Sequence, residues 1–138
     1  MSRAVFDSNV FISAFVFGGK PRRLWTAALD GEIELVCSPA LLTEAARVLG
    51  DKFALPDERV REFVIQVVRL ADVVEPTETL HVVDDEPDNR VFECAVEGGA
   101  DLVVTGDAHL LSVKVYNDIE IVTVAEALDR LGIGGDES

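Results

Sequence analysis

Short apolar runs alternate with helix-like stretches along nearly the whole length of this 138-residue sequence. Runs typical of buried strands occupy residues 4–6, 33–37, 100–105 and 119–122, with a weaker one at 73–75. Strands that alternate with helices pair in parallel and are covered on both faces, so the pattern predicts an α/β fold with a central parallel sheet. A chain of this length suits a single domain, which we expect at residues 1–131, followed by a flexible tail at 132–138.

The segments between the strands carry start and stop signals of helices. Gly18-Gly19 ends a first helix, and Pro21 opens a second that closes at Gly31. Ser38-Pro39 combines an N-cap with a first-turn proline and begins the next helix. Further helices are predicted over residues 58–70, 87–97 and 108–111, and a last one, capped by Thr123, runs through Leu131; residues 76–83 have the composition of a loop.

Four acidic residues stand where these elements meet. Asp7 follows the first strand, and Asp107 follows the strand at 100–105 in the same arrangement of strand, acid and short helix. Glu44 lies on the apolar stripe of its helix, and Asp88 lies in the first turn of another. Right-handed crossovers bring the carboxyl ends of parallel strands to one edge of a sheet, where α/β folds bind ligands. We therefore expect the four carboxylates to converge.

Clustered carboxylates repel one another, and without a cation some of them take up protons. Mg²⁺ or Mn²⁺ resolves the repulsion because both ions prefer oxygen ligands. Such a site can activate water and neutralise a leaving oxygen at a phosphodiester without histidine or lysine, which are scarce in this sequence. Two plainer interpretations stay open: Glu44 can extend to water from the flank of its helix, and the acids of 84–89 can serve the helix dipole.

The net charge of −14 is unusual for a protein that binds nucleic acid, because phosphates are normally met by a basic face. Bound metal ions supply positive charge where it is needed. Lys20, Arg22 and Arg23 also form a local basic cluster, for which we expect contact with an RNA backbone. Cys37 and Cys94 have no partners at zinc-ligand spacing and are predicted to be buried thiols. No run approaches 18 apolar residues and no signal peptide is evident, so we expect a cytoplasmic protein without a membrane span.

A set of ordered motifs resembles the PIN-domain family, in the branch assigned as toxin components of toxin–antitoxin systems. The matching segments are Val5-Phe6-Asp7-Ser8-Asn9-Val10, Ser38-Pro39 with Leu41-Leu42 and Glu44, Asp88-Asn89-Arg90-Val91-Phe92-Glu93-Cys94-Ala95, Gly98-Gly99-Ala100-Asp101, Thr105-Gly106-Asp107-Ala108-His109-Leu110-Leu111, and Ile121-Val122-Thr123 with Glu126. The resemblance covers nearly all of the chain. It implies a three-layer α/β/α sandwich with strand order 3-2-1-4-5 and a Mg²⁺- or Mn²⁺-dependent ribonuclease activity.

Carried over by position, the resemblance places the family's metal-binding and catalytic acids at Asp7, Glu44, Asp88 and Asp107. It implies polar support around them from Asn9, Thr105 and Asn89. The family often has aspartates around the proline before its third acid, and here Asp85 stands there as the alternative ligand to Asp88. Relatives of this size often form homodimers, and an antitoxin protein holds the toxins inactive. Other PIN proteins act in RNA processing or decay.

Three rival functions are open to the same sequence. Haloacid-dehalogenase phosphatases need a second acid two residues after the first one, and Asn9 occupies that position. A receiver-like signalling domain needs paired acids after the first strand and a late lysine, which Ser8 and Lys114 serve poorly. The third alternative is a PIN fold that binds RNA or protein without catalysis, against which the presence of all four acids argues.

Overall fold

The structure is a computed structural model that describes residues 2–133, in which a six-stranded sheet forms the centre. The strands are β1 (Arg3–Phe6), β2 (Glu34–Cys37), β3 (Asp72–Val73), β4 (Leu102–Val104), β5 (Val115–Tyr116) and β6 (Ile119–Val122). Their order across the sheet is β3-β2-β1-β4-β6-β5, and every neighbouring pair except β5–β6 is parallel. The predicted order of five parallel strands is confirmed, with β6 as the fifth.

The antiparallel edge strand β5 was not predicted from the sequence. It forms a hairpin with β6 through Asn117 and Asp118, whose φ angles of 49° and 66° are both positive. Two central residues with positive φ are typical of the tight turns that match the twist of a hairpin, and asparagine and aspartate tolerate this conformation. The hairpin adds a short edge to the sheet and leaves its parallel centre unchanged.

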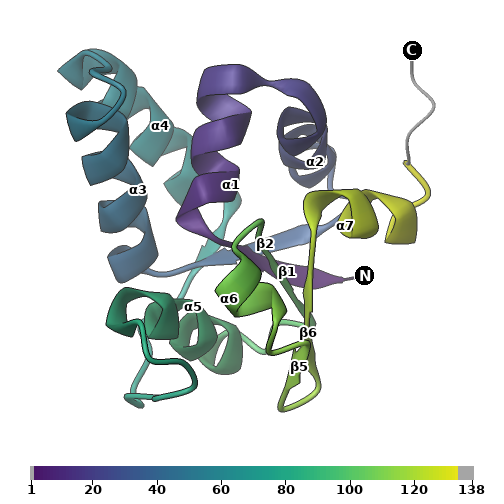
Figure 1. Cartoon of the computed structure of the whole chain (residues 1–138). Helices are drawn as coiled ribbons and strands as arrows, with labels where there is room; N and C mark the ends of the chain where they lie inside the picture. The colour runs from purple at the N-terminus through teal and green to yellow at the C-terminus, as the bar shows by residue number, and fades with distance from the viewer. Residues whose placement is uncertain (1, 134–138) are drawn as a thin grey trace.

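Helices cover both faces of the sheet (Figure 1). Helix α1 (Ser8–Ile12) runs into a π-helix, η1 (Ser13–Phe17); the others are α2 (Gly19–Leu29), α3 (Pro39–Asp51), α4 (Asp57–Leu70), α5 (Glu86–Glu97), α6 (Ala108–Leu111) and α7 (Val124–Arg130). Helices α1 to α4 and α7 gather on one side of the sheet, and α5 lies on the other against β1, β2 and β4. The predicted three-layer α/β/α sandwich is therefore confirmed.

An aromatic cluster fixes α1 against the sheet and its neighbours. The ring of Phe11 lies 5.5 Å from that of Phe6, 6.3 Å from Trp25 and 5.7 Å from Phe63, measured between centroids. Phe6, Phe11 and Phe63 are fully buried. Aromatic side chains contribute large buried areas and favourable edge-to-face contacts. Because Asp7 lies between Phe6 and α1, this packing also fixes the position of its carboxylate.

Most of the predicted flexible tail, residues 134–138, lies outside the described residues. Over the described range, 2–133, no helix combines the length and the apolar character that a membrane crossing requires.

Gly98 marks a close approach between α5 and the sheet, where we expect substitution to be costly. A Cβ at this position would lie 2.3 Å from Cγ1 of Val36 on β2. Gly98→Ala should therefore lower the free energy of unfolding by about 1–3 kcal/mol, measured by urea denaturation. Gly50→Ala is the matched control: nothing lies within 4 Å of its Cβ position, and alanine favours the helix by roughly 0.5–1 kcal/mol. Equal stability of the two variants would contradict the close packing of α5 on β2.

Candidate active site

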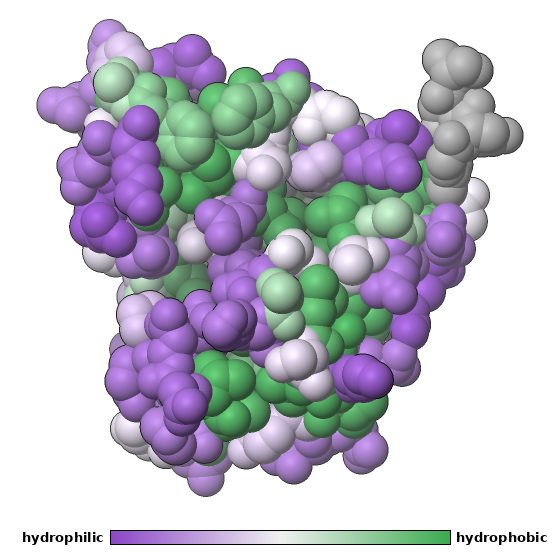
Figure 2. All heavy atoms as spheres, in the orientation of Figure 1, coloured by the Kyte–Doolittle hydropathy of each residue, from purple (hydrophilic) through white to green (hydrophobic). Residues whose placement is uncertain are grey.

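An acidic cavity of about 90 Å³ lies at the carboxyl edge of the sheet, where β1 ends and α3 and α5 begin. Its walls carry three of the four predicted acids, and the lining residues are Asp7, Ser8, Ala40, Leu41, Glu44, Pro87, Asp88, Arg90 and Val91. In the space-filling view, hydrophilic residues fill the middle of this face, where α1, α3, α5 and α6 approach one another (Figure 2). The cavity lies where an α/β sheet normally binds its ligand.

Asp7 is the most buried of the acids. Its side chain is 6% exposed, and its Oδ2 accepts a hydrogen bond of 2.8 Å from the hydroxyl of Thr105. Burial raises the pKa of the Asp7 carboxyl, and hydrogen bonds from Thr105, from Ser8 N–H and from Asn9 N–H oppose that rise. The charge of Asp107 raises the pKa further. Asp7 is thus an acid whose negative charge is costly until a cation neutralises it.

Asp107 is held at the start of α6 beside Asp7. Its backbone N–H donates to Oγ1 of Thr105 (3.0 Å), and its Oδ1 accepts from the backbone N–H of His109 (2.8 Å) as an N-cap. The fully buried Thr105 hydroxyl therefore bonds to both acids. Because Asp7 and Thr105 follow the neighbouring strands β1 and β4, parallel pairing sets this contact between residues far apart in the sequence.

Asp88 lies in the first turn of α5 and carries a strongly shifted pKa. Its pKa is raised to about 6, first by burial and then by the charge of Asp85, with smaller contributions from Asp107 and Asp7. His109 acts in the opposite direction. A carboxyl with this pKa is poised to change protonation near neutral pH, which is common at functional sites. Asp85, the alternative ligand, lies near enough to raise the pKa of Asp88.

Glu44 lines the cavity from α3, but its carboxylate bonds to a neighbour on its own helix. Its Oε1 accepts a hydrogen bond of 3.1 Å from Nη2 of Arg47, one turn along α3. The side chain is 39% exposed, which places Glu44 at the edge of the cavity rather than in the core. An exposed ion pair of this kind contributes little to stability and breaks readily, so the carboxylate is available for a stronger cation.

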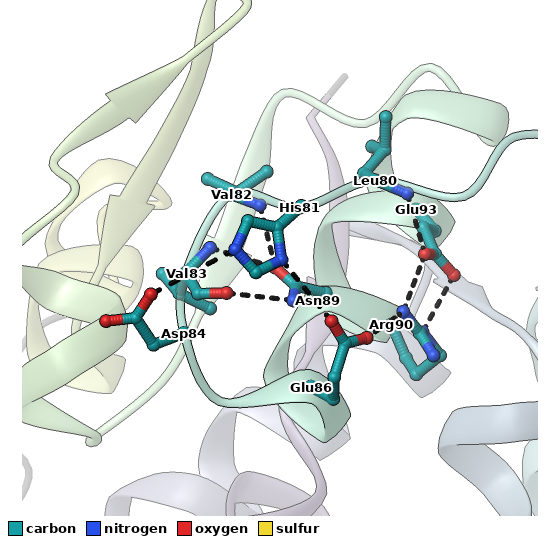
Figure 3. A network of polar contacts seen from close by, with 9 residues as sticks. All are labelled: Leu80, His81, Val82, Val83, Asp84, Glu86, Asn89, Arg90 and Glu93. Atoms are coloured by element: carbon teal, nitrogen blue, oxygen red, sulfur yellow. Dashed lines mark hydrogen bonds and ion pairs between the residues drawn. The ribbon is translucent and has the colours of Figure 1, made fainter.

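The three residues expected to support the acids occupy different environments. Thr105 contacts Asp7 and Asp107 as described, and Asn9 is exposed in the first turn of α1, where its backbone N–H helps to lower the pKa of Asp7. Asn89 is fully buried and faces the loop before α5 (Figure 3). Its Oδ1 accepts from the backbone N–H groups of Val82 (2.8 Å) and Val83 (2.9 Å), and its Nδ2 donates to the carbonyl of Val83 (2.9 Å). Asn89 therefore anchors that loop, and its side-chain hydrogen bonds within residues 2–133 go to the loop backbone rather than to the acids.

Asn89 is the first of three α5 side chains that hold residues 77–83 along the helix. Glu93, one turn further on, accepts from the backbone N–H of Leu80 (2.9 Å), and Glu97 accepts from the N–H and the hydroxyl of Thr77 (3.1 and 3.2 Å). This spacing of four residues places all three on one side of α5. These hydrogen bonds fix residues 77–83 against α5. They thereby also hold the start of α5, where Asp88 lies.

The sequence reasoning missed one residue of the cavity wall, Arg90. Its Nη2 donates to Glu86 (3.0 Å) and Glu93 (2.9 Å), and its Nε forms an ion pair with Glu93 at 2.9 Å without the angle of a hydrogen bond (Figure 3). Arg90 is a cation in an otherwise acidic lining. Its position three residues before Glu93 on a predicted helix was the available signal, because such pairs face each other.

The predicted basic cluster lies at the start of α2, away from the cavity lining. Lys20 is exposed and Arg23 is half-buried. Arg22 donates from Nε to the carbonyl of Ala14 (2.9 Å) and from Nη2 to that of Phe15 (3.2 Å), so its side chain closes the end of η1.

The acids fit a hard divalent cation by their chemistry. Carboxylate oxygens are the preferred ligands of Mg²⁺ and Mn²⁺. Burial, and after it the charges of neighbouring acids, raises the pKa values of Asp7 and Asp88, so that their ionised forms are costly without a cation. Within residues 2–133 no three histidine, cysteine or acidic side chains form a ready-made ligand group. Mg²⁺ retains several waters and needs only one or two carboxylates, so the donors present are sufficient in number.

Fold and cavity together define a three-layer α/β protein with an acidic site at the carboxyl edge of its sheet. Residues 3–109 match the family model of the PIN domain. The chain therefore belongs to the PIN-domain family, whose members are generally nucleases.

Two relatives extend this comparison. The uncharacterized protein MJ1680 of Methanocaldococcus jannaschii is 27% identical over 124 residues, which cover 83% of this chain and 77% of that protein. A chain in the crystal structure of VapBC2 from Rickettsia felis, bound to a DNA fragment from their promoter, superposes with a TM-score of 0.61. The match covers 88% of this chain and 98% of that one at 11% identity, so it shows a shared fold.

Proposed function

We propose that this protein is a metal-dependent ribonuclease that hydrolyses RNA phosphodiesters at the acidic cavity. The observation that carries the proposal is the single cavity that Asp7, Glu44 and Asp88 line together. The pKa of Asp88 agrees with it, because it is raised to about 6 by burial and by the charges of Asp85, Asp107 and Asp7. Acids from β1, α5 and the start of α6 thus act on one another although they are distant in sequence. Acids gathered in this way cost stability unless a cation neutralises them, and carboxyl groups with a raised pKa are common at functional sites.

Asp7, Asp88 and Asp107 would hold Mg²⁺ or Mn²⁺, and Glu44 would complete the set from α3. When bound, the ion supplies a nucleophilic water and neutralises charge on the phosphodiester. The Thr105 hydroxyl keeps Asp7 oriented by donating to its Oδ2 and fixes the start of α6 by accepting from Asp107 N–H. Asn89 and Glu93 keep the start of α5, and with it Asp88, in place by anchoring the loop at 80–83.

A toxin of a toxin–antitoxin pair is the form of this function that we propose, with an antitoxin protein as partner and a homodimer as the assembly. The resemblance of the sequence motifs supports it, and the R. felis VapBC2 complex supports it at the level of the fold. A PIN nuclease of RNA processing or decay is the alternative. Copurification of the protein with the product of an adjacent small gene distinguishes the two.

The direct test is incubation with structured and single-stranded RNAs in the presence of Mg²⁺, Mn²⁺ or EDTA. Cleavage should require metal, stop in EDTA and return with excess Mn²⁺. The same titration followed by thermal unfolding provides a readout without catalysis: at 100 times its Kd the metal should stabilise the fold by about 2.7 kcal/mol. Cleavage that persists in EDTA, or a melting temperature indifferent to both metals, would contradict the proposal.

A further inference from the structure

An exposed pair of aromatic rings lies at the far ends of the two helices that lead away from the cavity. Phe17 ends η1 and is 71% exposed, and Phe53 follows α3 and is 36% exposed. Their ring centroids are 5.8 Å apart at an interplanar angle of 79°. Figure 2 shows hydrophobic residues along the upper edge of the molecule, over the connection of α3 to α4 and the far end of α1. Single exposed apolar residues are ordinary, but two large rings in mutual contact in water form a patch.

The backbone under Phe17 is held firmly. Within η1, Phe15 turns inward and packs edge-on against Trp25 (5.8 Å) and Phe63 (4.8 Å). The N–H of Gly18 donates to the carbonyl of Ser13 (2.9 Å), and Arg22 binds the next two carbonyls as described above. π-helical turns are rare and occur frequently at functional sites. The outward position of Phe17 is therefore built into the turn and does not result from a loose end.

Two lysines stand close in sequence to this pair in a strongly acidic chain. The sequence has three lysines at a net charge of −14, and two of them, Lys20 and Lys52, are exposed within three residues of Phe17 or Phe53. The neighbouring acid Asp51 is 3.8 Å from Arg47 in an ion pair. Exposed aromatic rings flanked by cations match the chemistry of a single-stranded nucleic acid, which offers stacked bases and phosphates.

The pair is also correctly placed relative to the cavity. Asp7 precedes Phe17 by ten residues along α1 and η1, and Glu44 precedes Phe53 by nine residues along α3. Helices α1 and α3 pack against each other. At a helical rise of 1.5 Å per residue the separation is roughly 15 Å. About four stacked nucleotides cover that length at the spacing of 3.4 Å per phosphate.

We propose that Phe17, Phe53, Lys20 and Lys52 form a stacking platform for single-stranded RNA, separate from the acidic cavity. Bases stack on the two rings, the lysines contact phosphates, and the strand continues toward the cavity. The platform deepens the ribonuclease assignment, and it rests on that assignment for the identity of the strand as RNA.

The test is fluorescence anisotropy with a labelled single-stranded oligouridine of roughly 12 nucleotides, within the usual range of site sizes. All variants are made in an Asp7→Asn background and measured in EDTA, so that binding is recorded without cleavage. Phe17→Ala and Phe53→Ala should each weaken binding roughly 5- to 150-fold, the range for loss of one stacked base. Phe17→Tyr keeps an aromatic face and should retain the affinity. Val68→Ala, an exposed apolar residue of α4, should leave it unchanged.

The lysines give an independent readout. Lys20→Gln and Lys52→Gln should each reduce the slope of log affinity against log salt by roughly 0.7, the value per phosphate contact for a single strand. Unchanged binding by Phe17→Ala, or an equal loss in Phe17→Tyr, would overturn the platform. It would also be overturned if Phe17→Ala altered only self-association in sedimentation, because the patch would then bind protein. If the protein binds the oligonucleotide but shows no metal-dependent cleavage, the ribonuclease proposal is contradicted and the platform is retained. If it cleaves RNA but Phe17→Ala does not weaken binding, the platform is contradicted and the ribonuclease proposal is retained.

Discussion

Asp7→Asn is expected to abolish metal-dependent RNA cleavage while the fold stays intact. The substitution keeps the size of the side chain and an oxygen that can accept from Thr105, but it removes the negative charge of the most buried acid. Loss of one electrostatic group at a reacting centre commonly lowers kcat by about 10²–10³-fold. The measurement is the single-turnover cleavage rate at saturating Mn²⁺. A rate within a few-fold of the parent protein would show that Asp7 does not hold the metal.

Stability provides the control for this variant. Burial raises the pKa of Asp7, so the ionised carboxylate destabilises the folded state at neutral pH. Asparagine removes that penalty, and the variant in EDTA should unfold at the same or a higher temperature than the parent protein. Asp129→Asn, at an exposed position of α7, controls for the loss of one charge and should leave cleavage unchanged. If Asp7→Asn lost both activity and stability, the loss of cleavage could result from unfolding. Measuring the melting temperature beside the cleavage rate separates this case from a loss of metal binding.

The second large effect is a loss of cleavage at mildly acidic pH. Only the ionised Asp88 carboxylate can serve a cation, and its pKa is raised to about 6. The ionised fraction, and with it the rate, should fall roughly tenfold between pH 7 and pH 5. The contribution of Asp88 to stability in EDTA should show the opposite trend. Because its pKa is higher in the folded than in the unfolded state, this contribution is greatest below about pH 4 and is lost as the pH rises through about 6. A flat rate across this range would contradict the role of Asp88.

Asp85→Asn separates the two candidate ligands at the start of α5. The charge of Asp85 is the second-largest cause of the raised pKa of Asp88, after burial. If Asp88 is the ligand, Asp85→Asn stays active. The acidic limb of its pH–rate profile then moves to lower pH, because the charge of Asp85 no longer raises the pKa of Asp88. If Asp85 is the ligand, the rate at pH 7 falls as steeply as in Asp7→Asn. The pH profile of this one variant therefore assigns the site.

Local signals in the sequence were sufficient for the strands and helices of the fold. Alternating apolar runs and helix caps depend on neighbouring residues, and they placed β1, β2, β4 and β6 and the helices between them. Parallel pairing with right-handed crossovers allows few topologies. The strand order itself was implied by the resemblance to the PIN-domain family. Asp7 belongs to the same class of inference because it follows β1 directly, and Asp107 because it follows β4 after Thr105 and Gly106.

Only the tertiary structure decided the contacts that join separate segments of the chain. The side chain of Asn89 bonds to the loop at 82–83, and the Thr105 hydroxyl bonds to Asp7 across neighbouring strands. The contact of Phe17 with Phe53 joins residues from two helices that no local pattern relates. The physical reason is that sequence periodicity determines the face of a helix or strand on which a side chain lies. Its contacts with other segments depend on which residues the tertiary packing places opposite that face.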